Sequence, residues 1–155
     1  MSRVLTIDPG ANPGFCLVED GVVQWASHEA LRTGELDELV IEGQYAATHI
    51  YRGGRRVRVS RASQQGLSFT AGRLFERYPA ARKYRIQPSQ WRSILWPGAT
   101  RLPKPVVLAR LRTMIDPELY AHVPKKNQPD VIEAIGIALA WAKLTPARKK
   151  KFLYV

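Results

Sequence analysis

Short runs of β-branched and aliphatic residues, each closed by turn residues, predict five β-strands. These runs occupy residues 3–8, 14–19, 22–27, 38–42 and 83–87. Asp20-Gly21 separates the second run from the third and is a hairpin signal. The first three strands are therefore expected to form an antiparallel meander.

Longer amphipathic segments predict four helices in the remainder of the chain. The first runs from Ser60 or Ser63 to about Tyr78, and a short one begins at Pro88. The other two are expected at 104–115 and from Pro129 to about Lys143. We expect residues 51–61, with five arginines and a glycine pair, to form a mobile basic loop. The basic tail 148–155 is expected to be loose.

Length and composition narrow the class of protein. A chain of 155 residues corresponds to about one domain, here placed at 1–147 before the tail. With 45% hydrophobic and 24% charged residues, the composition excludes disorder throughout. No apolar run reaches the ~18 residues of a membrane span, and the first ten residues lack a signal-peptide layout. A single cysteine, Cys16, excludes an internal disulfide framework and fits a cytoplasmic location.

The distribution of charge is the most informative feature of the composition. The net charge is +11, and it divides into −6 over residues 1–50 and +17 over residues 51–155. Such a surplus favours a polyanionic partner, nucleic acid before a membrane surface. Five arginines lie close together and are expected to contact phosphates, although a merely solvated run is the alternative. They are Arg52, Arg55, Arg56, Arg58 and Arg61.

Two acidic residues end predicted strands. Asp8 closes the first strand before Pro9-Gly10, and Glu42 closes Leu-Val-Ile before Gly43. A carboxylate buried at a strand end is costly unless it is paired or binds a metal. The simpler alternatives are a turn-initiating aspartate at Asp8 and a solvated strand end at Glu42.

Asp130 and Glu133 stand three residues apart, which puts them on one face of the last predicted helix. Asp130 has a local explanation, because an acid in the first turn complements the helix dipole and Asn127 can complete a cap. Glu133 has none. It is the one charge between residues 131 and 142, in a helix apolar enough to be buried, so it needs a cation.

Four carboxylates without histidine or cysteine partners suit a hard cation, Mg²⁺ or Mn²⁺. Two such ions about 4 Å apart activate a water and stabilise the leaving oxygen of a phosphodiester. We therefore expect Asp8, Glu42, Asp130 and Glu133 to be both metal ligands and catalytic residues, with two ions per site. An acidic metal site in a basic protein is typical of a metal-dependent nuclease.

Three motifs resemble the RuvC-type Holliday-junction resolvases of the ribonuclease H superfamily, in a short form such as phages carry. They are VLTIDPG with Asp8, LVIEGQY with Glu42, and DVIEAIGIALA with Asp130 and Glu133. The family usually has two aspartates in the last motif. The resemblance implies an α/β ribonuclease H-like fold, a mixed five-stranded sheet flanked by helices, with the strands of Asp8 and Glu42 adjacent and parallel. It also implies Mg²⁺-dependent cleavage of four-way DNA junctions that leaves 5′-phosphate ends, without a nucleotide cofactor.

The resemblance carries three further residues. Tyr45 matches an aromatic residue that acts at the junction, and Lys104 matches a catalytic basic residue near the scissile phosphate. Arg92 stands near the position of the family's companion lysine and is the weaker match. Because a four-way junction is approximately two-fold symmetric, we expect a homodimer. Its candidate interface is the helix at 104–115.

Three alternatives stay open. A less selective nuclease would cut flaps, forks, other branched DNA or RNA–DNA hybrids. A non-catalytic DNA-binding protein would use its acids structurally. An actin-like nucleotide-binding domain shares the first motif, but it needs a second phosphate loop and a longer chain.

Overall fold

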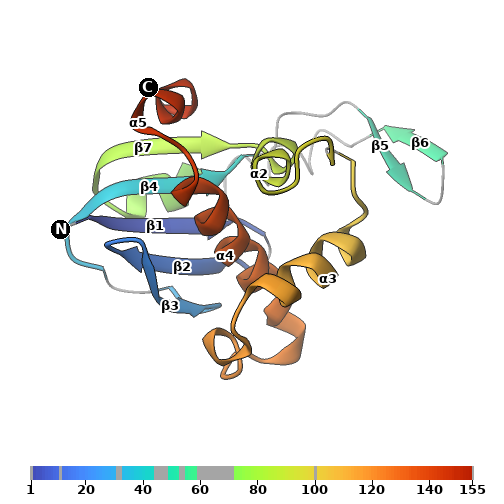
Figure 1. Ribbon diagram of the computed structural model, residues 1–155, viewed down its shortest axis with the longest axis horizontal. Helices are drawn as coiled ribbons and strands as arrows, with labels where there is room; N and C mark the ends of the chain where they lie inside the picture. Colours follow the sequence, from blue (N-terminus) through green and yellow to red (C-terminus); the bar gives the residue numbers. More distant parts are fainter. Residues whose placement is uncertain are drawn as a thin grey trace.

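The computed structural model describes residues 2–10, 12–30, 33–43, 49–52, 55–58, 72–99 and 101–154, with side chains outside 49–58. Its central sheet has the strand order β3-β2-β1-β4-β7 (Figure 1). These strands are β1 (Arg3–Asp8), β2 (Gly14–Glu19), β3 (Val22–Ser27), β4 (Leu36–Glu42) and β7 (Ala80–Ile86). The helices are α2 (Pro88–Leu95), α3 (Lys104–Met114), α4 (Gln128–Ala142) and α5 (Pro146–Lys149). Residues 72–77 are also helical.

Strand directions confirm the expected mixed sheet. β1 pairs antiparallel with β2, and β2 pairs antiparallel with β3. β4 runs parallel to β1 on one side and to β7 on the other. Helices flank this sheet, as expected for an α/β fold. Because β1 and β4 are parallel neighbours, their carboxyl-terminal residues, Asp8 and Glu42, lie at the same edge.

The two faces of β1 pack against different helices, since successive side chains of a strand point to opposite faces. Leu5 and Ile7 belong to the core that Leu74, of the helical stretch 72–77, also joins. Thr6 points the other way, and its hydroxyl donates a 2.7 Å hydrogen bond to the carbonyl oxygen of Ala134 in α4. Asp8 has the parity of Thr6 and therefore faces α4, which crosses the sheet in Figure 1.

The same alternation places two acids of β4 on the α4 face. Leu39 and Ile41 pack into the opposite core, whereas Val40 packs with the α4 residues. Glu38 and Glu42 share the parity of Val40. Both are buried, with 6% of each residue exposed, so the solvated strand end considered for Glu42 is excluded.

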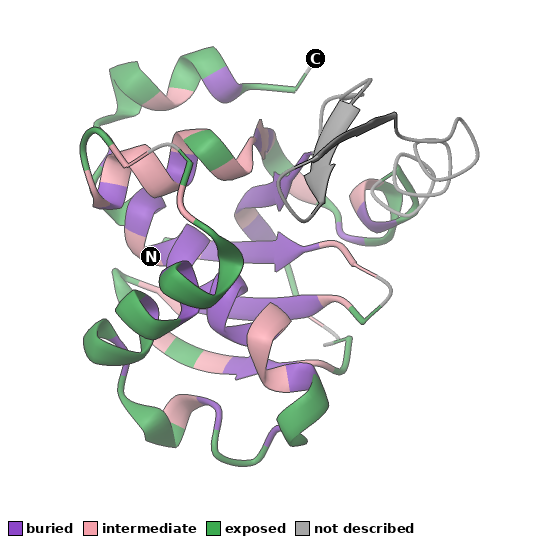
Figure 2. Cartoon of the chain, turned by 90° about the vertical axis from the view of Figure 1, so that its right-hand side faces the viewer, coloured by how far each residue is buried: buried purple, intermediate pink, exposed green. Residues whose placement is uncertain are grey.

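Helix α4 is the centre of the larger core. Ten of its fifteen residues are buried, Glu133 among them, as its apolar sequence predicts. Gly136 lets its neighbours approach. A β-carbon there would lie 2.9 Å from the Leu111 side chain of α3 and 3.1 Å from the Trp91 ring of α2. Figure 2 shows buried strands beneath helices whose outer turns are exposed.

Several predicted bounds change. β4 begins two residues before the predicted strand, at Leu36, and β7 covers Ala80–Ile86 instead of 83–87. The basic loop expected at 51–61 is wrong in part, because β5 (His49–Arg52) and β6 (Arg55–Arg58) form an antiparallel hairpin. The pairing of Arg52 with Arg55 fits the glycine pair, a two-residue hairpin signal that the arginines obscured. Asn127 precedes α4 without a side-chain cap.

The loose tail expected at 148–155 is also wrong as far as residue 154. α5 and a 3-10 turn at Lys150–Phe152 cover most of it. Phe152 is buried against Trp141, with ring centroids 6.0 Å apart. Leu153 forms a bridge to Tyr84 of the edge strand β7. One aromatic anchor outweighs the tendency of a basic terminus to stay solvated.

Within the part of the chain that is described, no helix has the length and apolar character that crossing a membrane requires.

Candidate metal centre

Three of the four predicted carboxylates converge where β1 and α4 meet. Asp8, Asp130 and Glu133 each present an oxygen, and these atoms all lie within 4.8 Å of one another. Asp8 and Glu133 are buried, whereas Asp130 is partly exposed at the rim. This is the one group of potential metal ligands that the described ranges bring together. It spans 125 residues of sequence.

A glycine sets the distance between the two elements. Gly14 is the register partner of Asp8 across β1 and β2. A β-carbon at Gly14 would lie 2.2 Å from the carbonyl oxygen of Asp130 and 2.6 Å from the nitrogen of Val131. Only a residue without a side chain allows the start of α4 to approach so closely. The contact brings the Asp130 carboxylate to the end of β1.

Glu42 stands beside this group, outside the 4.8 Å set. Its Oε2 accepts a 2.7 Å hydrogen bond from Nε1 of Trp91, a side chain with no exposed surface. Burial raises the pKa of Glu42 from 4.5 to about 7. The Trp91 hydrogen bond and the charges of Arg92 and Lys104 lower that pKa, while Glu133 raises it. Glu42 is therefore electrostatically part of the cluster.

Two predicted cations reach the same carboxylates. Nη2 of Arg92 lies 3.3 Å from Oε1 of Glu133. Nζ of Lys104 lies 3.5 Å from Oε2 of Glu133 and 3.6 Å from Oδ1 of Asp130. The cation that the sequence requires for Glu133 is thus supplied twice, from α2 and from α3. The side chain of Lys104 is half-exposed, whereas Arg92 is mostly covered.

Burial and neighbouring charges shift the pKa values of Asp8, Asp130 and Lys104. Burial, followed by the charge of Glu42 and the proximity of Glu133, holds the pKa of Asp8 well above its ordinary value. Burial also raises the pKa of Asp130, against the opposing pull of Lys104. For Lys104, burial lowers the pKa, but the carboxylates of Glu133, Asp130 and Asp8 outweigh it and raise the value. The cluster carries more negative charge than its two cations neutralise.

The donor set fits a hard divalent cation. Oδ2 of Asp8 is buried and has no hydrogen-bond partner, which is costly for a carboxylate oxygen without a metal ligand role. All available donors are carboxylate oxygens, the type that Mg²⁺ and Mn²⁺ prefer. Four acids against Lys104 and Arg92 leave a charge of −2 when every acid is ionised, which one divalent ion balances.

The remaining predicted residues are not placed at this centre. Tyr45 and Arg61 lie outside the described residues. Arg52, Arg55, Arg56 and Arg58 belong to the β5–β6 hairpin, whose backbone alone is described. Trp91 lies in the core and also donates a hydrogen bond to Glu42, a contact that no sequence motif predicts.

No family model matches the chain, and no curated protein does. The chain is similar to a solved structure titled "Thermus thermophilus RuvC structure", at 19% identity and a TM-score of 0.46, over 91% of this chain and 93% of that one.

Proposed function

We propose that this protein is a divalent-metal-dependent nuclease that resolves four-way DNA junctions by hydrolysing phosphodiester bonds. The observation that carries the proposal is the convergence of Asp8, Asp130 and Glu133 around an unpartnered carboxylate oxygen, in a chain of net charge +11. The basic surface attracts a polyanionic substrate, and a divalent cation held by the acidic residues would bind its phosphate.

The four carboxylates would hold the cation, Mg²⁺ or Mn²⁺, with Glu42 oriented by Trp91. A bound divalent cation of this type supplies activation of a water and stabilisation of the leaving oxygen. One divalent ion balances the charge of −2 in the site, so the charge of a second ion would be balanced by the phosphate of the substrate. Glu42, with a pKa near 7, must lose its proton before it can serve as a ligand.

Lys104 is the side chain best placed to receive the substrate. Its ammonium group pairs with Asp130 and Glu133 and is half-exposed, so it can also reach a phosphate oxygen outside the cluster. Arg92 is more covered and holds Glu133 in place. We assign Lys104 to the scissile phosphate and Arg92 to the orientation of Glu133.

Selection of branched DNA is the finer part of the proposal, and it follows from the family resemblance of the three acidic motifs. Figure 1 shows the β5–β6 hairpin on the side where β1 and β4 end. Its four arginines, with Arg61, would bind DNA backbone beside the metal centre, and Tyr45 would stack at the junction centre.

We also propose a homodimer, because two incisions on a two-fold substrate are most simply made by a two-fold protein. The predicted interface on α3 has less exposed apolar surface than expected. Of the six large apolar residues in the predicted helix at 104–115, only Val106 and Met114 are exposed, at 39% and 42%. The others are buried within the subunit: Val107, Leu108, Leu111 and Ile115. The dimer therefore needs surface beyond α3, and light scattering with and without junction DNA tests for it.

The deciding experiment incubates the protein and Mg²⁺ with a synthetic four-way junction, a flap, a fork, a linear duplex and an RNA–DNA hybrid. We expect paired nicks and 5′-phosphate ends on the junction, and little product from the duplex. Equal cleavage of flaps, forks or hybrids would replace the resolvase by a less selective nuclease. Tight binding without cleavage in Mg²⁺ or Mn²⁺ would make it a non-catalytic DNA-binding protein.

A further inference from the structure

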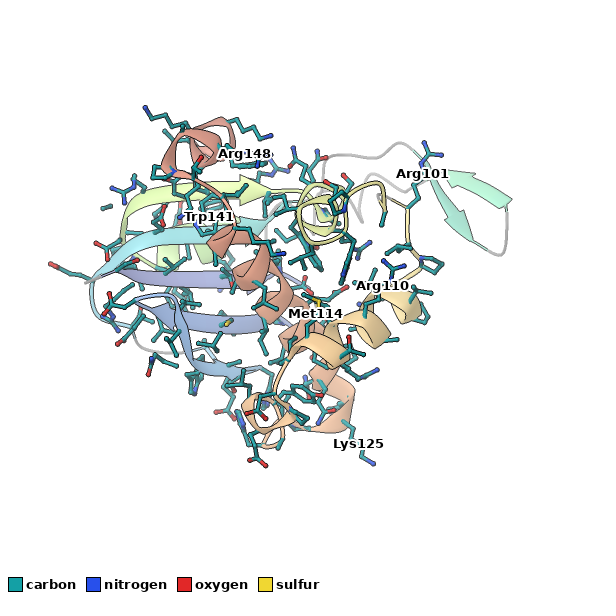
Figure 3. All side chains as sticks on the ribbon, in the orientation of Figure 1. Arg101, Arg110, Met114, Lys125, Trp141 and Arg148 are labelled. Atoms are coloured by element: carbon teal, nitrogen blue, oxygen red, sulfur yellow. The ribbon has the colours of Figure 1, made fainter. Side chains whose placement is uncertain are left out.

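A groove of about 460 Å³ lies between α2 and the carboxyl-terminal segment, away from the acidic cluster. Its lining combines three cations with two polar and several apolar side chains. The cations are Lys143, Arg148 and Lys151. Figure 3 shows Arg148 on the α5 side of this region, next to α2.

The three cations are not neutralised. All are exposed, and none forms an ion pair with any acidic side chain that is described. Lys151 contacts the ring of Phe152, 5.0 Å from its centroid, which leaves its charge uncompensated. Three such charges at one groove create a positive potential that attracts an anion.

The cationic wall is anchored firmly. Lys149, between Arg148 and Lys151, turns inward, and its Nζ lies 3.2 Å from Oε1 of the buried Glu38. The same ammonium group lies 5.1 Å from the ring centroid of Trp141. Phe152 is buried beside it, so the segment is fixed at two points. Arg148 and Lys151 are thereby held at the groove.

The opposite wall belongs to α2. Gln90, Ser93 and Ile94 line the groove, and their spacing of three and four residues puts them on one helical face. Arg92 follows Gln90 by two residues, about 200° around the helix, and pairs with Glu133. The groove and the metal centre thus lie on opposite sides of α2. Lys143 of the groove follows Glu133 by ten residues along α4, about 15 Å, which equals roughly four to five base steps of duplex DNA.

We propose that this groove binds the phosphodiester backbone of the nucleic-acid substrate, roughly four to five nucleotides from the scissile phosphate. The inference rests on the proposed function for the identity of the polyanion. Lys143, Arg148 and Lys151 bind phosphate oxygens, and Ile94 and the exposed Pro97 offer apolar surface to the sugars. Because the groove lies across α2 from the metal centre, its expected occupant is the nucleic-acid strand that is cleaved rather than an unrelated acidic partner.

The test compares two charge-matched double variants, Arg148→Ala/Lys151→Ala and Lys125→Ala/Lys126→Ala. All four residues are exposed, and Figure 3 shows Lys125 and Arg148 far apart. Affinity for a four-way junction and for a duplex is measured with EDTA present, from 50 to 200 mM salt, so that no cleavage is needed. In the groove variant, the slope of log K against log salt concentration should be about 2 less negative than in wild type. Its loss of affinity relative to wild type should therefore be about tenfold smaller at 200 mM than at 50 mM salt. The control should keep the wild-type slope.

A second measurement uses the buried position of Cys16, the sole cysteine. A Ser93→Cys variant carries one accessible thiol in the groove, and Ala121→Cys carries one on an exposed residue elsewhere. DNA should slow alkylation at position 93 at least tenfold and leave position 121 unchanged. Protection by inorganic phosphate but not by DNA, or an unchanged salt slope in the groove variant, would overturn the proposal. Groove binding without any nuclease activity would leave the proposal standing and refute the catalytic function instead.

Discussion

Nε1 of Trp91 donates a 2.7 Å hydrogen bond to Oε2 of Glu42. Trp141 and Glu38 repeat the arrangement at the other end of β4, where Nε1 lies 3.4 Å from Oε1. Each buried glutamate of the strand thus has an indole donor, but their cations differ. Glu38 is neutralised by Lys149, whereas Glu42 lies among other acids. Glu42 is therefore suited to bind a metal ion, whereas Glu38 stabilises the fold.

Trp91→Phe removes the hydrogen bond that lowers the pKa of Glu42, so that pKa should rise. Metal binding, followed by calorimetry from pH 6 to 9, should move its midpoint to higher pH. Trp141→Phe is the matched control, because it loses the same kind of bond at Glu38. Both variants should lose stability, about 1.5–3 kcal/mol from the charged hydrogen bond. If both shifted the pH midpoint equally, Trp91 would have no specific effect on Glu42.

Stability of the metal-free protein should fall as pH rises. Below pH 4.5 Glu42 is protonated in both states, and between 4.5 and about 7 the folded state keeps a proton that the unfolded state has lost. The free energy of unfolding therefore decreases through this interval, by on the order of 3 kcal/mol for Glu42. Urea unfolding at pH 5, 6 and 7.5 measures it.

Glu42→Gln supplies the comparison for that titration. Its stability, subtracted from that of wild type at each pH, isolates the Glu42 contribution and should show the same downward slope. In wild type, saturating Mg²⁺ should restore the stability that is lost by pH 7.5, because the ion binds the folded state. A difference that stays flat from pH 5 to 7.5 would mean that Glu42 titrates normally.

Asp8→Asn should stabilise the metal-free protein. The change keeps the shape of the side chain and removes one charge from the repulsion with Glu42, Glu133 and Asp130. We expect a gain of about 0.5–2 kcal/mol at pH 8, typical of a relieved functional site, together with complete loss of cleavage. Glu118→Gln, at an exposed acid, should change neither quantity. A destabilised Asp8→Asn protein would show that Asp8 has a structural partner.

Gly14→Ala should separate Asp130 from Asp8. The added carbon would meet the α4 backbone at 2.2 Å, and backbone cannot rotate away, so the start of the helix must shift. The expected cost is about 1–3 kcal/mol of stability and at least tenfold in metal affinity. Gly72→Ala, where a β-carbon would have nothing within 4 Å, is the control. Unchanged metal affinity in Gly14→Ala would show that the Gly14 contact is unimportant for the site.

Local patterns predicted the sheet well. The bounds of β1, β2 and β3 were correct to the residue, because Pro9-Gly10, Asn12-Pro13 and Asp20-Gly21 mark their ends. The hairpin of β5 and β6 was missed because arginines masked its alternation. The carboxyl-terminal segment was missed because its anchor, Phe152 on Trp141, joins residues whose contact no local pattern shows.

The candidate site divides in the same way. Asp8, Asp130 and Glu133 could be named from sequence, because Asp8 ends an apolar strand, Glu133 is the one charge of an apolar helical segment, and Asp130 shares its helical face. The hydrogen bond from Trp91 to Glu42 joins residues 49 positions apart, and the approach of Gly14 to Asp130 joins two distant elements. Glu38 was not singled out, because its cation, Lys149, comes from the segment that was expected to be loose.

Calorimetric titration of Mn²⁺ into the metal-free protein at pH 8 tests the carboxylate cluster directly, without any assumption about DNA. Asp8→Asn and the surface control Glu118→Gln are titrated in parallel. Wild type and Glu118→Gln should bind Mn²⁺ with the same affinity, and Asp8→Asn should lose at least about a hundredfold, equivalent to roughly 2.7 kcal/mol. Binding of equal strength in Asp8→Asn, or no Mn²⁺ binding by wild type, would contradict a metal centre at Asp8, Asp130 and Glu133.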